Sequence, residues 1–386
     1  MVRGASIWMT AIALVAQGGL TAAQEVHRTA LHDFRVVTVA EGLEVPWSMA
    51  WLPGGDMLIT ERPGRLRIVR DGRLRPDPVA GVPEVFAEGQ GGLFDVLPHP
   101  EFETNRLLYL SYARPLADGS TTAVIRGRFE NDALTGVEDV FVADSSGRGH
   151  YGGRMTWDAD GMLRVSVGER MAPSTGDLTA HPAQDLTNHH GVTIRLHPDG
   201  TVPDDNPFVG RTDVHPEIYS YGHRNPQGLV VHPATGEVWV TEHGPQGGDE
   251  LNLIQPGLNY GWPVVGYGVN YGSGAKIHDA TQADGMENPR HFWVPSIGTS
   301  GLMIYTGDRF PEWRGDFFAG GLSGEQVGRL TPSIDQPGRI EREETVVYGL
   351  GRIRDIRQGP DGYIYVALEA REGTTPVVRL EPVARR

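Results

Sequence analysis

The sequence has 386 residues, of which 39% are hydrophobic and 22% charged, and its 52 glycines and 28 prolines favour many turns around a large core over long helices. The formal net charge of −15 argues against nucleic acid and anionic membrane surfaces as partners. The chain contains no cysteine, which excludes disulfides, thiolate metal sites and cysteine nucleophiles.

The first 23 residues have the pattern of a secretory signal peptide. Arg3 precedes an apolar run over residues 5–16, and small residues lead up to Ala23, after which we expect cleavage. A retained N-terminal anchor is the alternative, although the run is short for a membrane span. We therefore expect a secreted or periplasmic protein whose mature part, residues 24–386, forms a single domain with no membrane span.

From residue 34 onward, short alternating strands are separated by Gly, Pro, Asp and Asn. A unit of one turn and one strand recurs six times, near residues 55, 105, 161, 236, 315 and 362. The irregular spacing fits four-stranded blades that carry loop insertions. The pattern predicts an all-β fold, a six-bladed β-propeller with four-stranded antiparallel blades and long inter-strand loops. A pair of β-sandwiches is the alternative. The early strand Phe34–Val39 is expected to close the ring with the last blade.

Three of the repeated strands end directly in a charged pair, namely Glu61-Arg62, Glu169-Arg170 and Glu242-His243. Equivalent positions of successive blades surround the propeller axis at one level, so these side chains are expected to converge on a central opening. A solvated rim is the alternative. The widest intervals between units contain residues 219–263, where glycines flank polar groups that are costly to bury. Loops on a rigid scaffold often hold the functional site, so we expect it here.

Candidate side chains follow in chain order. His150 is flanked by glycines just before a predicted strand, which is compatible with a general base, although a lone histidine is usually structural. Arg224 and Asn225 offer hydrogen-bond donors between turn-forming residues, and an arginine that braces loops is the alternative for Arg224. No G-x-S-x-G or Walker A motif appears, and no G-x-G-x-x-G occurs in a strand–helix context.

Two further patterns point to ligands. Gly244-Pro245, followed by Asp249-Glu250 and Tyr260, offers backbone and carboxylate oxygens of the kind that suit Ca²⁺, and no spacing supports zinc. Arg352 and Arg354 alternate along a predicted strand, which places both guanidiniums on one face and Asp355 on the other. Two like charges side by side are unfavourable unless acids or a multiply anionic ligand offset them.

Seven segments together resemble the family of soluble, PQQ-dependent aldose sugar (glucose) dehydrogenases, which also includes the propeller domain of Hedgehog-interacting proteins. They are VPWSMAWLPGGDMLITERPGRLRIV, GQGGLFDVLPHPEF, GRGHYGGRMTWDADGMLRVSVGER, DGTVPDDNPF, SYGHRNPQGL, EHGPQGGDELNLIQPGLNYGWP and GRIRDIRQGPDGYIYV. The combination of GHRNPQGL with EHGPQGGDELN is the most specific part of the match.

The resemblance implies a role for each matching residue. His150 corresponds to the catalytic base that takes the hydroxyl proton at the anomeric carbon while hydride passes to PQQ, and Arg224 lies near the reacting carbonyl. The implied PQQ contacts are Gln90, Arg224, Asn225, Arg352 and Arg354, with Trp293 stacked on the ring system. The carbonyls of Gly244 and Pro245 correspond to ligands of the Ca²⁺ that contacts PQQ, and Glu250 and Tyr260 to ligands of a further, structural Ca²⁺.

The sequence also departs from the family pattern. Ser323 occupies the place of a PQQ-contacting lysine, Gly149 replaces an acid found in some relatives, and Arg170 replaces a neutral polar residue. The leading hypothesis is PQQ- and calcium-dependent oxidation of an aldose to a lactone, with electrons passed to an unknown acceptor such as a cytochrome or a quinone. The alternatives are a non-catalytic, calcium-binding interaction module and a calcium-dependent hydrolase of lactonase type.

Overall fold

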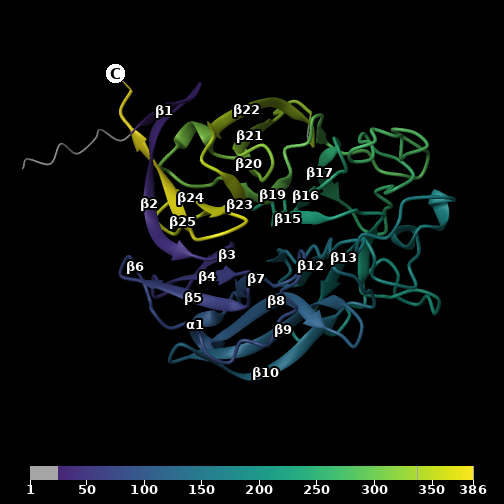
Figure 1. The fold of residues 1–386 in the computed structure, drawn as a ribbon, viewed down its shortest axis with the longest axis horizontal. Helices are drawn as coiled ribbons and strands as arrows, with labels where there is room; N and C mark the ends of the chain where they lie inside the picture. Colours follow the sequence, from purple (N-terminus) through teal and green to yellow (C-terminus); the bar gives the residue numbers. More distant parts are fainter. Residues whose placement is uncertain (1–24, 337, 386) are drawn as a thin grey trace, which may run out of the picture.

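The computed structural model describes residues 25–336 and 338–385, so the predicted signal peptide lies outside the described residues. Within them the regular structure is almost entirely strand, in six antiparallel sheets that form a ring (Figure 1). This arrangement confirms the predicted six-bladed β-propeller. No helix in the described part of the chain has the length and apolar character needed to cross a membrane.

The blades follow one another along the chain. The first comprises β3 (Pro46–Trp51), β4 (Met57–Glu61), β5 (Arg65–Arg70) and β6 (Arg73–Leu74). The second comprises β7 (Leu93–Pro98), β8 (Leu107–Pro115), β9 (Ser120–Glu130) and β10 (Ala133–Val142), with the short helix α1 (Phe102–Asn105) after β7. The third comprises β11 (Met155–Trp157), β12 (Leu163–Val167), β13 (Val192–Leu196) and β14 (Ile218–Tyr221), and the fourth β15 (Pro226–Val231), β16 (Val238–Glu242), β17 (Asp249–Ile254) and β18 (His291–Trp293). The fifth comprises β19 (Thr299–Ile304), β20 (Phe317–Gly321), β21 (Gln326–Pro332) and β22 (Ile340–Tyr348). Short 3₁₀ turns cover Leu178–Ala180, Pro182–Gln184 and Pro311–Trp313.

The sixth blade joins the two ends of the chain. Its C-terminal strands are β23 (Arg352–Gln358), β24 (Ile364–Glu369) and β25 (Thr375–Val383), and β2 (Asp33–Leu43) pairs antiparallel with β25. Partner positions include Val36 with Leu380 and Thr38 with Val378. The edge strand β1 (Val26–Arg28) adds to β2. The expectation that Phe34–Val39 closes the ring is therefore confirmed.

The six repeated units of the sequence form the second strand of each blade, namely β4, β8, β12, β16, β20 and β24. Every residue of β4, β12, β16, β20 and β24 is buried. Blades stack face to face, so both sides of these strands meet a neighbour, and apolar residues can occupy successive positions. Hydrophobic clusters fill the spaces between adjacent blades.

Four of these strands end in, or lead directly to, a buried glutamate. Glu61, Glu169, Glu242 and Glu369 are 0%, 2%, 4% and 8% exposed, so the solvated-rim alternative is wrong for them. A buried carboxylate needs a partner, and each one has a partner on a neighbouring segment. The partners are Arg65, His150, His223 and Arg354, respectively, at 2.6, 2.7, 3.0 and 2.6 Å.

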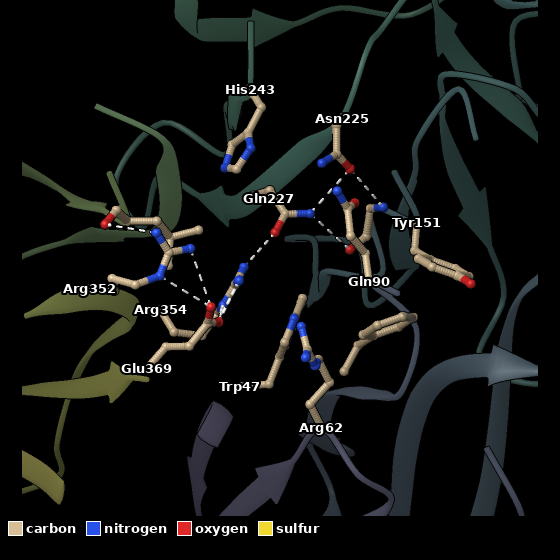
Figure 2. Close-up of a pocket in the computed structure, with 13 residues that line it drawn as sticks. Trp47, Arg62, Gln90, Tyr151, Asn225, Gln227, His243, Arg352, Arg354 and Glu369 are labelled. Atoms are coloured by element: carbon tan, nitrogen blue, oxygen red, sulfur yellow. Dashed lines mark hydrogen bonds and ion pairs between the residues drawn. The ribbon is translucent and has the colours of Figure 1, made fainter. Parts of the chain in front are cut away.

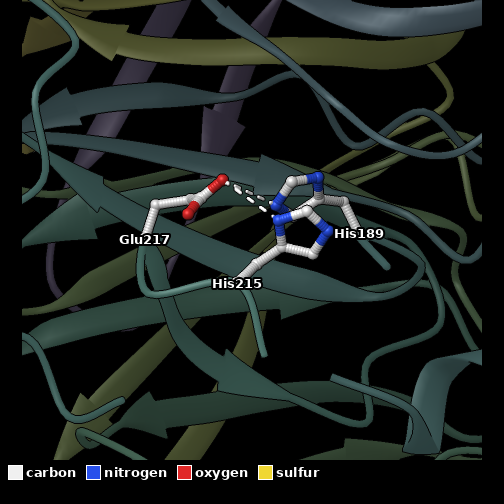
Figure 3. Close-up of side chains that lie close together, drawn as sticks. All are labelled: His189, His215 and Glu217. Carbon is white, nitrogen blue, oxygen red and sulfur yellow. Dashed lines mark ion pairs between the residues drawn. The ribbon is translucent and has the colours of Figure 1, made fainter. Parts of the chain in front are cut away.

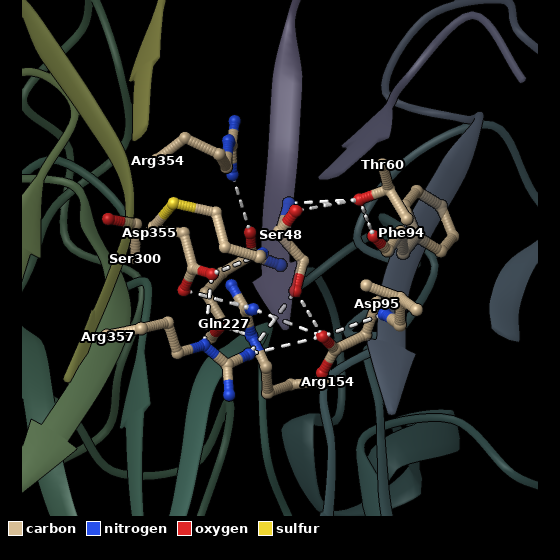
Figure 4. A network of polar contacts seen from close by, with 12 residues as sticks. Ser48, Thr60, Phe94, Asp95, Arg154, Gln227, Ser300, Arg354, Asp355 and Arg357 are labelled. Carbon is tan, nitrogen blue, oxygen red and sulfur yellow. Dashed lines mark hydrogen bonds and ion pairs between the residues drawn. The ribbon is translucent and has the colours of Figure 1, made fainter. Parts of the chain in front are cut away.

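Near the centre of the ring, an ionic network ties blades together (Figure 4). The fully buried Arg154 lies 3.1 Å from Asp355 and stacks over Trp47 at 4.1 Å. Arg357 contacts Asp355 at 3.0 Å and Asp95 at 3.1 Å. Two guanidiniums and two carboxylates balance one another, which is the condition under which buried charges are tolerated.

Candidate functional site

A cavity of about 170 Å³ opens at the centre of the propeller (Figure 2). Its lining comes from all six blades or the loops that join them, so it lies where the blades converge. The lining residues are Trp47, Arg62, Gln90, Phe94, Tyr151, Gly152, Asn225, Gln227, His243, Leu322, Arg352, Arg354 and Glu369. Four of the five predicted PQQ contacts other than Trp293 are among them: Gln90, Asn225, Arg352 and Arg354. We refer to this space as the central cavity.

The central cavity carries excess positive charge. Arg352 and Arg354 both line it, as their alternation predicted, and Asp355 turns away to accept a hydrogen bond from the Met49 amide at 3.1 Å. Glu369 contacts Arg354 at 2.6 Å and Arg352 at 3.3 Å. Burial opposes ionisation of Glu369, but the two arginines outweigh it and hold its pKa below the usual value. With Arg62, three guanidiniums face a single carboxylate, which fits an anionic ligand.

An amide chain fixes the orientation of the polar lining. Asn225 Oδ1 accepts hydrogen bonds from the Gly152 amide at 3.1 Å and from Gln227 Nε2 at 3.2 Å. Gln227 Oε1 accepts a hydrogen bond from Arg354 Nη1 at 2.9 Å. Gln227 thus joins two predicted ligand contacts. Sequence reasoning missed it, although it lies inside the HRNPQG motif.

His150 forms a buried dyad with Glu169. Its Nδ1 lies 2.7 Å from Glu169 Oε1, and its backbone amide donates to Gln90 Oε1 at 2.9 Å. A hydrogen on Nδ1 that faces the carboxylate leaves Nε2 with a free lone pair, which is the form that a base needs. Burial lowers the pKa of His150, and Glu169 partly offsets this effect. The role of Glu169 was not predicted, although its recurrence at strand ends was a usable signal.

The loop that carries His150 has a constrained backbone. His150 has φ +43°, a region that residues other than glycine rarely adopt. A Cβ on Gly168 would lie 2.2 Å from the His150 carbonyl oxygen, so only glycine permits this close approach. Arg170 donates to the carbonyls of Gly149 and Gly147, the latter at 2.9 Å, and stacks over Tyr151 at 3.6 Å. Arg170, which differs from the family pattern, therefore braces the loop that holds the dyad.

A second cavity adjoins the first, and His243 lines both. We call it the carboxylate cavity because Glu242 and Glu250 line it. All four predicted calcium-binding residues line it together: Gly244, Pro245, Glu250 and Tyr260. Arg224 also lines it, and its Nη1 donates to the Gly244 carbonyl at 2.7 Å. The Tyr260 hydroxyl donates to the Leu253 carbonyl at 2.6 Å, so the backbone carbonyl is the oxygen that Tyr260 would offer to a cation.

The carboxylate cavity fits a cation. Glu242 and Glu250 are directly opposite each other on β16 and β17 and are buried. Burial raises the pKa of Glu242 to about 7, and burial together with Glu242 raises that of Glu250 well above its usual value. His223, 3.0 Å from Glu242, does not supply the missing positive charge, because burial lowers its pKa to about 3. A divalent ion would relieve the repulsion between the two carboxylates.

His150 lines neither cavity, but it contacts the lining residue Gln90. Trp293, by contrast, is a predicted residue that the structure does not bring together with the others. It is 5% exposed, packs in the cluster with Trp239 and Leu251, and donates from its indole to Glu343 at 2.7 Å. It is not among the residues that line either cavity. Trp47 lines the central cavity and Trp262 the carboxylate cavity, where Trp262 lies 5.1 Å from the Arg224 guanidinium. Spacing along a chain does not reveal which tryptophan faces the opening.

His189, His215 and Glu217 gather in the third blade (Figure 3), and none of them lines the central or the carboxylate cavity. Their ligand-type atoms lie within 4.8 Å of one another, with His189 Nε2 3.1 Å from Glu217. The Asp144 amide, however, donates to His189 Nδ1 at 2.8 Å, so the hydrogen of a neutral His189 is on Nε2. A metal-bound histidine normally donates from its second nitrogen instead. We interpret the cluster as a structural group in which the buried His189 is paired with Glu217.

Comparisons with known proteins agree with the fold. A family model described as "Glucose / Sorbosone dehydrogenase" matches residues 43–379. An uncharacterised protein of Synechocystis sp. is 46% identical over 362 residues, covering 90% of this chain and 87% of the relative. Aldose sugar dehydrogenase YliI of Escherichia coli is 40% identical over 347 residues, covering 88% of this chain and 91% of the relative. The PQQ-bound aldose sugar dehydrogenase of Streptomyces coelicolor matches with a TM-score of 0.73 at 27% identity, covering 91% of this chain and 98% of that one.

Proposed function

This chain belongs to the glucose/sorbosone dehydrogenase family, whose model matches most of its length, and we propose that it oxidises aldose sugars at the anomeric carbon to lactones with PQQ and Ca²⁺ as cofactors. The observation behind the proposal is the adjacency of three elements: a cationic central cavity, a carboxylate cavity that shares His243 with it, and a buried histidine–glutamate dyad whose His150 contacts the cavity-lining Gln90. Each element alone has structural explanations. Together they match the requirements of a tricarboxylate quinone, a divalent ion and a base.

The residues present fit PQQ. The three guanidiniums of the central cavity outnumber its one carboxylate, so carboxylates of the cofactor would meet net positive charge. Two buried nitrogens near this space, Arg224 Nε and His243 Nε2, have no hydrogen-bond partner among the described residues. Arg352, Arg354, Gln90 and Asn225 would hold the cofactor, and the free Nε of Arg224 would be available to one of its oxygens. Whether Trp293 stacks on the cofactor stays a prediction.

Proton transfer is the part of the reaction that this chain performs directly. PQQ, when bound, supplies a quinone that accepts the hydride from the anomeric carbon. His150 Nε2 takes the proton of the anomeric hydroxyl, so the sugar loses two electrons and two hydrogens and becomes the lactone. Glu169 accepts from Nδ1, keeps the reactive tautomer in place and stabilises the imidazolium that forms. The electrons then leave to an external acceptor.

The carboxylate cavity would hold Ca²⁺, which supplies a positive charge that polarises a bound carbonyl. The carbonyls of Gly244 and Pro245 would contact this ion, and Glu250 with the carbonyl of Tyr260 would hold a further, structural Ca²⁺ at the same cavity. We add Glu242 to the proposed ligands, because it faces Glu250 across the strand pair.

Reconstitution tests the proposal. Purified apoprotein is mixed with PQQ and Ca²⁺, and reduction of an artificial electron acceptor by glucose and other aldoses is measured. We expect activity that requires both cofactors. No reduction with any aldose, in a protein that stays folded, would favour the non-catalytic interaction module. Turnover of a lactone without PQQ would favour the lactonase-type hydrolase.

We also propose that the protein is exported and that residues 24–386 form one catalytic domain. The support is the signal-peptide pattern of residues 1–23 and the single closed ring. N-terminal sequencing of the protein from its native host is expected to begin at Gln24. An intact N-terminus on a membrane-associated protein would instead indicate a retained anchor.

A further inference from the structure

Arg62 is the one arginine of the central cavity whose guanidinium makes no hydrogen bond or ion pair with the described residues. Arg352 and Arg354 both contact Glu369. The charges of Glu369, Arg352 and Arg354 act on Arg62 at a distance, and its guanidinium forms no hydrogen bond with any of them. Burial lowers its pKa, attraction to Glu369 partly opposes this effect, and repulsion from the two arginines adds to it. An arginine held near two like charges without a partner is unfavourable unless something else occupies the site.

The backbone fixes Arg62 in this position. It follows β4 directly, its amide donates to the Val45 carbonyl at 3.0 Å, and its carbonyl accepts from the Leu93 amide at 3.0 Å. A Cβ on Gly92 would lie 2.4 Å from Arg62 Cγ, so the glycine leaves room for the side chain. Figure 2 shows the guanidinium entering the cavity from the side opposite Asn225. Arg62 therefore occupies a built position beside the paired arginines.

We propose that Arg62 binds a carboxylate of the ligand that occupies the central cavity. The charge balance leads to this assignment: Glu369 already engages Arg352 and Arg354, and no lining carboxylate remains for Arg62. A guanidinium presents parallel N–H donors that match a carboxylate. Two ligands could supply this carboxylate. One is PQQ itself, in which case the inference rests on the proposed function, and the other is an acidic aldose such as a hexuronic acid.

The experiment compares Arg62→Gln, Arg62→Lys and a matched control, Arg73→Gln. Arg73 is an exposed arginine of the same blade, outside both cavities, and its replacement removes the same formal charge. Binding of PQQ to each apoprotein is measured by fluorescence titration. The Michaelis constants of the loaded enzymes are then measured for glucose and for glucuronate.

If Arg62 binds the cofactor, Arg62→Gln weakens PQQ binding about 10- to 100-fold, Arg62→Lys less, and Arg73→Gln has no effect. If it binds an acidic sugar, PQQ affinity is unchanged, and the Michaelis constant rises for glucuronate alone. Equal PQQ affinity and equal constants in wild type and Arg62→Gln would overturn the assignment. Failure of PQQ to bind the wild type would instead count against the proposed function.

Ligand-free stability gives an independent readout. Because Arg62 is desolvated beside two other arginines, Arg62→Gln is expected to melt at the same temperature as the wild-type apoprotein or higher. A purely structural arginine would behave in the opposite way. A fall in the melting temperature of the apoprotein that matched the loss of binding would show that Arg62 supports the fold rather than the ligand.

Discussion

The contact between His150 and Glu169 allows a quantitative test of the proposed proton transfer. Both side chains are at least nine-tenths buried and lie 2.7 Å apart. A hydrogen bond to a charged group contributes about 1.5–3 kcal/mol, against about 0.5–1.5 kcal/mol for a neutral one. Glu169→Gln keeps an acceptor but removes the charge, so we expect a loss of about 1–2 kcal/mol. This corresponds to a decrease in kcat of about 5- to 30-fold.

The pH dependence of the rate should also shift, and the direction of the shift follows from the pKa of His150. The neutral imidazole is the active base, so the rate falls as the pH drops through the pKa of His150. Burial lowers this pKa, and Glu169 opposes the effect. In Glu169→Gln the opposing interaction is lost, so the pKa falls further, and the acidic limb of the kcat/KM profile moves to lower pH. Glutamine thus lowers the maximal rate while extending the pH range of the free base.

The assay is steady-state acceptor reduction by the PQQ-loaded enzyme at saturating sugar, with PQQ titration in parallel. PQQ affinity should change little, because Glu169 does not line the central cavity. Glu61→Gln is the matched control, since it alters a buried strand-end glutamate that contacts Arg65 instead of His150. A wild-type kcat in Glu169→Gln, or an acidic limb that moves upward, would refute the dyad.

Four further outcomes follow from the same geometry. His150→Gln should lower kcat about 10²- to 10⁴-fold with PQQ still bound, as dye reduction and PQQ titration will measure. Arg354→Ala should weaken PQQ about 10- to 100-fold, and unchanged affinity in a titration would contradict its role. Ser323→Lys should tighten PQQ if the pocket keeps the family geometry, since Ser323 follows the cavity-lining Leu322; looser or equal binding would indicate a rebuilt pocket. Chelation of calcium should lower the melting temperature of the wild type by more than that of Glu250→Gln, because one of the two facing carboxylates is neutral in the variant. Equal shifts of the two melting temperatures would place the ion elsewhere.

The fold could be predicted from the sequence because one strand of each blade carries a strong local signal. A turn followed by an apolar run identifies β4, β12, β16 and β24, since blades cover both faces of these strands. The partner of the early strand could also be predicted, because a closed ring needs one. Outer strands such as β10 and β22 are more exposed and their pairing is interrupted by irregularities in register, so their limits could not be fixed from pattern alone.

The candidate site was predicted less completely, for a physical reason. His150 and Arg224 belong to motifs, but their partners come from other blades, and distance along the chain does not reveal such contacts. Glu169 and Gln227 acquire their roles only when the ring closes. The orientation of a side chain can be equally hidden, as for Trp293, which turns into the packing between blades. Arg62, by contrast, faces the opening, as its place in a charged pair at a strand end predicted.

The pairing of β2 with β25 has a consequence for how the chain can be cut. The early strand β2 and the last described strand β25 meet in one sheet, so the ring depends on a noncovalent seam between them. A circularly permuted gene that links the last strand to the first and begins between two other blades would make the two sides of that seam one continuous segment of chain. Truncation before residue 44 would do the reverse, exposing the edge of β25 to pairing with other chains.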